Sequence, residues 1–186
     1  MKKQLMACAL AAMMLVTAGC DDDEQGACEM PDQKVAGQQI EVHEQFPTFT
    51  AKTLDGETVT NQIFSGKKLT VVNMHATFCG PCIAEMPELG EWADEMPNDV
   101  QLIGIVCDVQ GENDTATIND AKRILRDANA GFVNIIPSAD LTAYLSTIEA
   151  VPTTIFVNGE GRIVGDPIVG ADVDGYKDFV EDYLRD

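Results

Sequence analysis

Apolar residues follow two spacings along this chain, and each spacing predicts a different element. An apolar, β-branched run at 69–72 predicts a strand over 69–75, and a continuous apolar run at 100–107 predicts a strand that is buried on both faces. Between these runs, apolar residues recur every three or four positions, which predicts a helix that begins near residue 80. The apolar positions of that helix are Ile83, Met86, Leu89, Ala93 and Met96. The middle of the chain is therefore predicted as strand, helix and strand, the order of a parallel crossover.

The rest of the chain continues the alternation of strands and helices. A hairpin with a tight Asp55-Gly56 turn is expected at 46–60, and a helix at 115–129. Further elements are expected at 132–136 (strand), 141–148 (short helix), 153–157 and 162–169 (a second strand pair), and 172–184 (helix, apolar at Val173, Tyr176, Val180 and Leu184). This order predicts an α/β fold with parallel crossovers and an antiparallel edge.

The N-terminal segment has the three parts of a secretory signal. Lys2 and Lys3 precede an apolar run that is too short to span a bilayer, and small residues follow it. The stretch 16–20 resembles a bacterial lipobox, which implies cleavage after residue 19 and a lipid on Cys20. Ordinary secretory cleavage, with Cys20 unmodified, is the alternative. Residues 1–19 are thus predicted as a lipoprotein signal peptide, and Cys8 leaves with it.

Charge and composition define the next segment and exclude some partners. The chain has 31 acidic and 12 basic residues, a net charge of −19, and every acidic residue lies after residue 20. A surface with this much negative charge repels nucleic acid and anionic lipid headgroups. Residues 20–44 are polar and acidic and bury little apolar surface, so we predict a flexible acidic tether there and a folded domain at 45–186.

Candidate chemistry lies at the junction of the first buried strand and the helix after it. Cys79 and Cys82 are separated by Gly-Pro at this junction, which is typical of a redox-active dithiol. Cys79 precedes the first helical turn, whose free N–H groups stabilise a thiolate, and Cys82 is placed to resolve a mixed disulfide. The alternative, half of a zinc site, needs a second ligand pair. His43 and His75 are isolated, so no metal or cofactor is expected.

Four motifs in order resemble the thioredoxin-fold proteins of the TlpA/ResA-like group. They are 76–82 (Ala-Thr-Phe-Cys-Gly-Pro-Cys), 85–89 (Glu-Met-Pro-Glu-Leu), 151–153 (Val-Pro-Thr) and Gly170. The resemblance covers residue 46 to the C-terminus. It implies a three-layer fold with a central mixed sheet between helices, an N-terminal β-hairpin and an inserted helical segment. Phe78 stands where the family usually has Trp, and Asn73 where cytosolic thioredoxins keep a buried acid.

The resemblance also implies roles for residues around the dithiol. Glu85 corresponds to an acidic residue that affects active-site protonation, and it is a candidate acceptor for the Cys82 proton. A solvated helix glutamate is the alternative. Pro152 corresponds to a cis-proline that faces the dithiol, where the backbone of Val151 can pair with an extended client. His75 is either a tuner of thiol protonation or a packing residue.

Two further cysteines have several possible states. Cys28 and Cys107 are compatible with a structural disulfide, with a buried free thiol at Cys107, or with a third redox-active thiol. The buried free thiol is the default, because free cysteine is among the most buried residue types.

Together these features predict a monomeric, membrane-anchored, extracytoplasmic thiol–disulfide oxidoreductase on the periplasmic or cell-surface side. The resemblance implies reduction of client protein disulfides, in cytochrome c maturation or methionine sulfoxide reductase recycling, with electrons from a CcdA- or DsbD-type membrane protein. One alternative is a peroxiredoxin-like peroxidase, whose signature needs Pro at the position of Asn73. Another is a copper-binding chaperone that uses Cys79 and Cys82, although such proteins usually space the cysteines by three.

Overall fold

Eight strands form the sheet around which residues 42–185, the part that the computed structural model describes, are arranged. The strands are β1 (Val42–Gln45), β2 (Thr50–Thr53), β3 (Thr58–Thr60), β4 (Leu69–His75), β5 (Val100–Val106), β6 (Val133–Ile136), β7 (Thr153–Asn158) and β8 (Arg162–Val169). The helices are the 3₁₀ helix η1 (Asn61–Phe64), α1 (Gly80–Glu95), α2 (Thr115–Asp127), α3 (Ala139–Leu145) and α4 (Val173–Arg185).

The two strands predicted from unbroken apolar runs lie at the centre of the sheet. The strand order is β1-β8-β7-β4-β5-β6-β2-β3, with β4 parallel to β5 and antiparallel to β7. Every residue of β4 is buried, because helices or loops cover both faces of this strand. The polar edges of the sheet are antiparallel pairs, β1 with β8 and β2 with β3.

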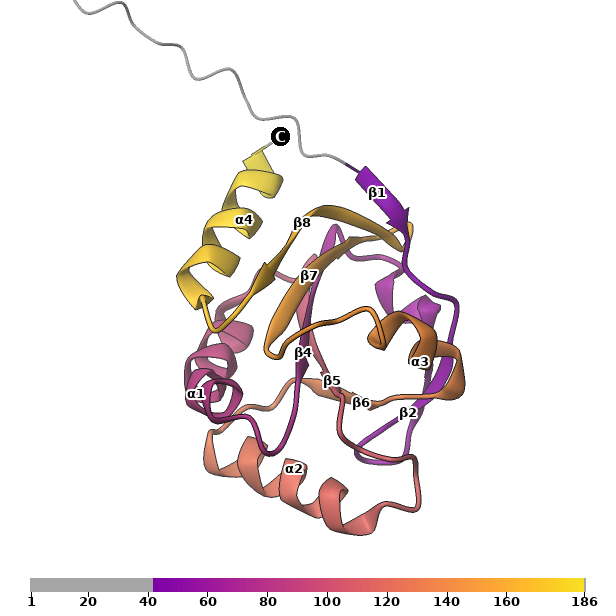
Figure 1. Cartoon of the computed structure of the whole chain (residues 1–186). Helices are drawn as coiled ribbons and strands as arrows, with labels where there is room; N and C mark the ends of the chain where they lie inside the picture. Colours follow the sequence, from indigo (N-terminus) through magenta and orange to yellow (C-terminus); the bar gives the residue numbers. More distant parts are fainter. Residues whose placement is uncertain (1–41, 186) are drawn as a thin grey trace, which may run out of the picture. The chain divides into compact units, whose positions relative to one another are not determined.

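Helices cover both faces of the sheet and make three layers (Figure 1). One core cluster joins the sheet to α1, α2 and α4, and the other joins it to η1 and α3. The predicted α/β class, the mixed sheet between helices, the β2–β3 hairpin and the inserted helix α3 are confirmed.

Helix α1 starts and stops for local reasons. Cys79 is its N-cap and Pro81 lies in its first turn, where a missing N–H costs no hydrogen bond. The helix continues through Pro87 and ends at Glu95, because Met96 precedes Pro97 and is extended. Its buried side chains, among them Met86 and Leu89, belong to the core cluster that also contains Leu69 and Val71 of β4.

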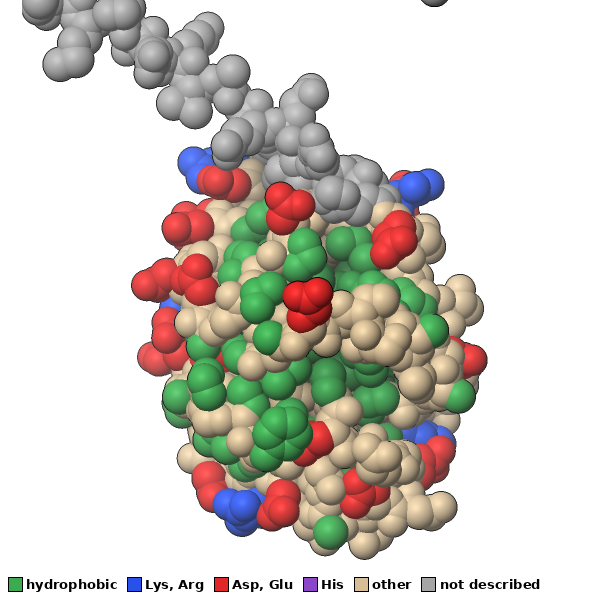
Figure 2. Space-filling model, in the orientation of Figure 1, with side chains coloured by type: hydrophobic (Ala, Val, Ile, Leu, Met, Phe, Trp, Pro, Cys, Tyr) green, Lys and Arg blue, Asp and Glu red, His purple; other side chains and the backbone are tan. Residues whose placement is uncertain are grey.

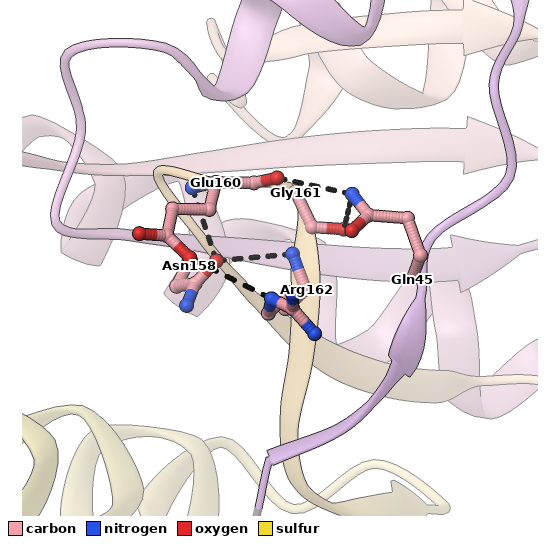
Figure 3. A network of polar contacts seen from close by, with 5 residues as sticks. All are labelled: Gln45, Asn158, Glu160, Gly161 and Arg162. Atoms are coloured by element: carbon pink, nitrogen blue, oxygen red, sulfur yellow. Dashed lines mark hydrogen bonds and ion pairs between the residues drawn. The ribbon is translucent and has the colours of Figure 1, made fainter.

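The edge strand β1 is attached through a polar network at the β7–β8 turn (Figure 3). The Gln45 side-chain amide donates to the carbonyl oxygens of Glu160 (3.0 Å) and Gly161 (2.7 Å). The Asn158 side-chain oxygen accepts from the backbone N–H groups of Glu160 and Arg162, both at 3.0 Å. This turn requires a residue with a left-handed backbone conformation, and Gly161 (φ +78°) adopts it.

The sheet begins earlier than the sequence indicated. Strand β1 starts at Val42, within the stretch predicted as tether, whereas the folded domain was expected from residue 45. The predicted signal peptide, the lipidation site Cys20, Cys28 and most of the tether lie outside the described residues. Among residues 42–185, no helix is both long and apolar enough to cross a membrane.

Candidate active site

Cys79 and Cys82 form a disulfide at the N-terminus of α1. Cys82 is fully buried, whereas Cys79 keeps 8% of its surface exposed. The Sγ atom of Cys79 accepts a hydrogen bond from the backbone N–H of Cys82, at 3.2 Å. When the disulfide opens, this N–H and the helix dipole stabilise negative charge on Cys79 more than on the buried Cys82. The arrangement therefore favours Cys79 as the attacking thiolate.

The loop before β7 packs against this disulfide. The Val151–Pro152 peptide bond is cis, as the family resemblance implied. The carbonyl oxygen of Val151 lies 3.4 Å from the Sγ atom of Cys79. Within residues 42–185 the N–H of Val151 has no hydrogen-bond partner. The backbone of Val151 therefore lies beside the reactive sulfur with a donor free to bind an extended peptide.

Glu85 is buried on the inner face of α1, so the interpretation as a solvated helix residue is wrong. Its side chain is 4% exposed. Oε1 accepts from the amide Nδ2 of Asn73 at 2.8 Å, and Oε2 lies 3.2 Å from the hydroxyl of Tyr176. Burial raises the pKa of Glu85, and the bonds to Asn73 and Tyr176 oppose that rise. Both of its hydrogen bonds go to these residues and neither to Cys82.

The raised pKa of Glu85 makes stability depend on pH. Folded protein keeps the Glu85 proton at pH values where the unfolded chain has lost it, so stability falls as pH rises from the ordinary value of 4.5 through the raised pKa. Glu85→Gln removes this pH dependence. As pH rises through that range, the unfolding free energy of the variant relative to wild type is expected to increase by at most about 1.4 kcal/mol per pH unit. Denaturant unfolding of the disulfide form at several pH values measures this.

A matched change on the same helix separates burial from charge. Glu91→Gln replaces an exposed glutamate of α1 and should keep the pH dependence of wild type. If Glu85→Gln follows the wild-type curve in parallel at every pH, the Glu85 carboxyl has no raised pKa.

Asp108 is a site residue that the sequence analysis missed. Both of its carboxylate oxygens lie 3.1 Å from the backbone N–H of Thr77, and one also accepts from the Thr77 hydroxyl. These bonds fix the turn between β4 and α1 that carries Cys79. The available signal is its place two residues after β5, since the ends of adjacent parallel strands meet at one edge of a sheet.

Asp108→Ala is expected to loosen that turn. Charge-assisted hydrogen bonds to a partly exposed carboxylate are lost, and the free energy of unfolding should fall by about 1–2 kcal/mol. Urea unfolding of the disulfide form checks this. Asp127→Ala removes a carboxylate whose only described partner is an exposed arginine at 3.7 Å, and it should change stability by less than about 0.5 kcal/mol. Equal losses in the two variants would contradict a special role for Asp108.

His75 lies at the end of β4 and is buried. Its Nε2 is 2.8 Å from the side-chain oxygen of Asn134, whose amide nitrogen donates to the carbonyl of Phe132. Nε2 therefore carries the proton and donates. Burial lowers the pKa of His75, against the raising effects of Asn134 and Asp108. His75 and Cys82 line the same narrow crevice between α1 and α2. Packing and tuning both fit this position.

Cys107 follows β5 directly and has a free thiol. Its side chain is partly buried, and burial, with the nearby charge of Asp108, raises the pKa of the thiol to about 12. A thiol with so high a pKa is a poor nucleophile at neutral pH. Cys107 is thus a free thiol as predicted, but it is partly buried where a buried thiol was expected, and Cys28 lies outside the described residues.

Apolar side chains surround the dithiol on the surface. Phe78 is 79% exposed and Ile83 is 40% exposed. Figure 2 shows hydrophobic side chains gathered on this face of the molecule, over the end of β4 and the start of α1, with acidic side chains mainly around them. Among residues 42–185, no group of three His, Cys, Asp or Glu side chains is arranged to hold a metal ion.

Comparisons with known proteins identify this arrangement. The model of the Redoxin family matches residues 41–179. The thioredoxin-like protein YneN of Bacillus subtilis is 35% identical over 66 residues, which are 36% of this chain and 38% of YneN. The thiol-disulfide oxidoreductase ResA of Bacillus thuringiensis is 24% identical over 149 residues, 80% of this chain and 79% of ResA.

A solved structure shows the same fold. A protein from Chlorobium tepidum, assigned as thiol:disulfide interchange protein DsbE, superposes with a TM-score of 0.62 at 18% identity, over 79% of this chain and 98% of that one. The Cys79–Cys82 pair lies at the N-terminus of α1 in a three-layer thioredoxin-like fold. The chain therefore belongs to the Redoxin family, and within it to the thioredoxin-fold, TlpA/ResA-like group of thiol–disulfide oxidoreductases.

Proposed function

We propose that this protein reduces disulfides of client proteins outside the cytoplasm, with Cys79 as nucleophile and Cys82 as resolving cysteine. The observation that carries the proposal is the Cys79 sulfur itself. The Cys79 residue keeps 8% of its surface exposed, whereas Cys82 keeps none, and the Cys79 sulfur accepts a hydrogen bond from a helix N-terminal N–H at 3.2 Å and lies beside the Val151 backbone. The Gly-Pro pair between the cysteines resembles that of reducing thioredoxins.

The reaction has two exchange steps. The Cys79 thiolate attacks one sulfur of the client disulfide, which forms a mixed disulfide and releases the other client sulfur as a thiolate that takes up a proton. Cys82 then loses its proton and attacks the Cys79 sulfur. The second client thiolate leaves, and the product is the Cys79–Cys82 disulfide. The client gains two electrons and two protons, and a donor must return both to the dithiol.

Glu85 is the acceptor that we assign to the Cys82 proton. It lies one helical turn after Cys82 on the buried side of α1. Its raised pKa suits a group that takes a proton from a thiol and later returns it. Because its hydrogen bonds go to Asn73 and Tyr176, it acts from beneath the dithiol and leaves the client side open.

A client is expected to bind across the loop before β7. An extended segment can pair with the backbone of Val151 while its apolar side chains contact Phe78 and Ile83. The net charge of −19 favours segments that carry basic residues near the target disulfide.

The location and electron supply follow from the leader and from the family. A lipid on Cys20 would anchor the monomer to the membrane and place the domain on the periplasmic or cell-surface side, in line with the lipoprotein-type signal predicted for residues 1–19. Reduction there requires electrons from inside, and a CcdA- or DsbD-type membrane protein is the donor that we propose. Apocytochrome c and a surface methionine sulfoxide reductase are the candidate clients.

Insulin reduction tests the activity. With dithiothreitol as the electron source, the protein should accelerate the precipitation of insulin B chains well above the uncatalysed rate. A rate equal to that of dithiothreitol alone would overturn the reductase assignment. Stoichiometric copper binding by the reduced protein without disulfide exchange would favour the copper chaperone instead.

A further inference from the structure

The hydroxyl of Tyr176 lies among several polar groups in the interior, one of which is the Thr154 side chain. The side chain is fully buried on α4. Its oxygen is 2.6 Å from the carbonyl oxygen of Gly170, 3.2 Å from Oε2 of Glu85, and 3.3 Å from the backbone nitrogen of Asp172, which donates to it. A hydroxyl donates one hydrogen bond, and a carbonyl oxygen can only accept. The short contact therefore requires the Tyr176 proton to point at Gly170.

This orientation sets the protonation of Glu85. When the hydroxyl proton of Tyr176 points at the Gly170 carbonyl, the Tyr176 oxygen presents a lone pair to Oε2 of Glu85. Oε2 must then carry a proton and donate it to Tyr176. Asn73 donates to Oε1 at 2.8 Å in either state, which leaves Oε2 as the protonated oxygen. When Oε2 loses its proton, the buried carboxylate needs a donor. The Tyr176 hydroxyl can supply one only by rotating away from Gly170.

Gly170 connects the Tyr176 hydroxyl to the loop before β7, which lies beside the Cys79–Cys82 disulfide. Its N–H donates to the carbonyl oxygen of Pro152 at 2.8 Å. The preceding residue, Val151, has its carbonyl oxygen 3.4 Å from the Cys79 sulfur. The buried acid is therefore linked to the loop before β7 by the hydrogen bonds of Tyr176 and Gly170, with the Gly170 backbone as the covalent connection between them.

We propose that Tyr176 is a positioning residue whose hydroxyl alternates between Gly170 and Glu85, and so couples the proton on Glu85 to the attachment of the loop before β7. The inference rests on the function proposed above, in which Glu85 accepts the Cys82 proton. Before resolution the hydroxyl donates to ionised Glu85. As the Cys82 proton moves to Oε2, the hydroxyl turns to Gly170. In the disulfide form, after the client has left, the Tyr176–Gly170 hydrogen bond therefore stabilises the attachment of the loop.

The other groups near Glu85 leave this role to Tyr176. On α1 the nearby charge is Glu88, which is paired with Lys177 of α4 at 2.6 Å. The strands beneath contribute the uncharged Asn73 of β4 and Thr154 of β7, which are hydrogen-bonded to each other at 3.1 Å. Burial raises the pKa of Glu85, which keeps its protonated form accessible.

Carbon-13 NMR of the full chain in its disulfide form tests the coupling without a client. We expect the backbone carbonyl shift of Gly170 to titrate with the same midpoint as the Glu85 side-chain carboxyl. In Tyr176→Phe, Glu85 should still titrate while the Gly170 shift loses its pH dependence. Tyr183→Phe removes a hydroxyl from the same helix and should leave both titrations as in wild type.

Two results would overturn the proposal. One is a Gly170 carbonyl that does not follow Glu85 in wild type, and the other is a Gly170 carbonyl that still follows it in Tyr176→Phe. If Tyr176→Phe does not fold, Glu85→Gln provides the same test, because the Gly170 shift must then become independent of pH. No thiol and no client take part, so this experiment can fail while insulin is reduced, and it can succeed while insulin is not.

Discussion

Cys79→Ser is expected to lower dithiothreitol-driven insulin reduction to the uncatalysed rate. A serine hydroxyl does not exchange with disulfides, so the first step is lost although the helix N-terminus still offers its N–H groups. Cys82→Ser should behave differently. Its Cys79 still attacks, but nothing in the protein resolves the product, so one client remains attached to each protein molecule. Mass spectrometry of the non-reduced sample identifies this mixed disulfide.

Cys107→Ser is the matched control for both variants. The Cys107 thiol has a pKa of about 12 and forms no disulfide when Cys79 and Cys82 are oxidised. Removing this thiol should therefore leave insulin reduction at the wild-type rate. A Cys79→Ser variant that retains most of the activity would show that the nucleophile lies elsewhere. Client trapping by Cys79→Ser rather than by Cys82→Ser would reverse the two roles.

The elements around the dithiol could be predicted because their signals are local. An apolar run predicts a strand that is covered on both faces of the sheet, and β4 and β5 are buried on both faces. The dithiol follows from the spacing of Cys79 and Cys82, and the position of Pro152 follows from a family motif. The edge strand β1 has no such signal. It is short, and backbone pairing and the Gln45 side chain hold it.

The polar partners of the site could not be predicted because they join distant parts of the chain. Asp108 contacts a residue 31 positions away, and Tyr176 contacts Glu85 across 91 positions. The helical pattern correctly predicted that Tyr176 is buried, but it gives no information on what a buried hydroxyl faces. The same pattern left Glu85 open between exposure and burial, since the adjacent turns of α1 contain both buried and exposed positions.

Gly104→Ala, which adds a single methyl group to β5, is expected to destabilise the protein strongly. A Cβ atom at this position would lie 2.0 Å from the side-chain oxygen of Asn134 and 3.0 Å from Nε2 of His75. The buried His75–Asn134 hydrogen bond must then open or move. Overpacking and an unpaired buried polar group each cost about 1–3 kcal/mol, so we expect a loss of about 3 kcal/mol in urea unfolding.

Two comparisons separate the clash from a general intolerance of alanine. Gly131→Ala places its Cβ in open space and should change stability by less than about 0.5 kcal/mol. In an Asn134→Ala background the closest obstacle is gone, so Gly104→Ala should cost clearly less than in wild type. Equal costs in the two backgrounds would mean that Asn134 is not what excludes a side chain at residue 104. The glycine would then be needed for the β5 backbone and not for the buried hydrogen bond between His75 and Asn134.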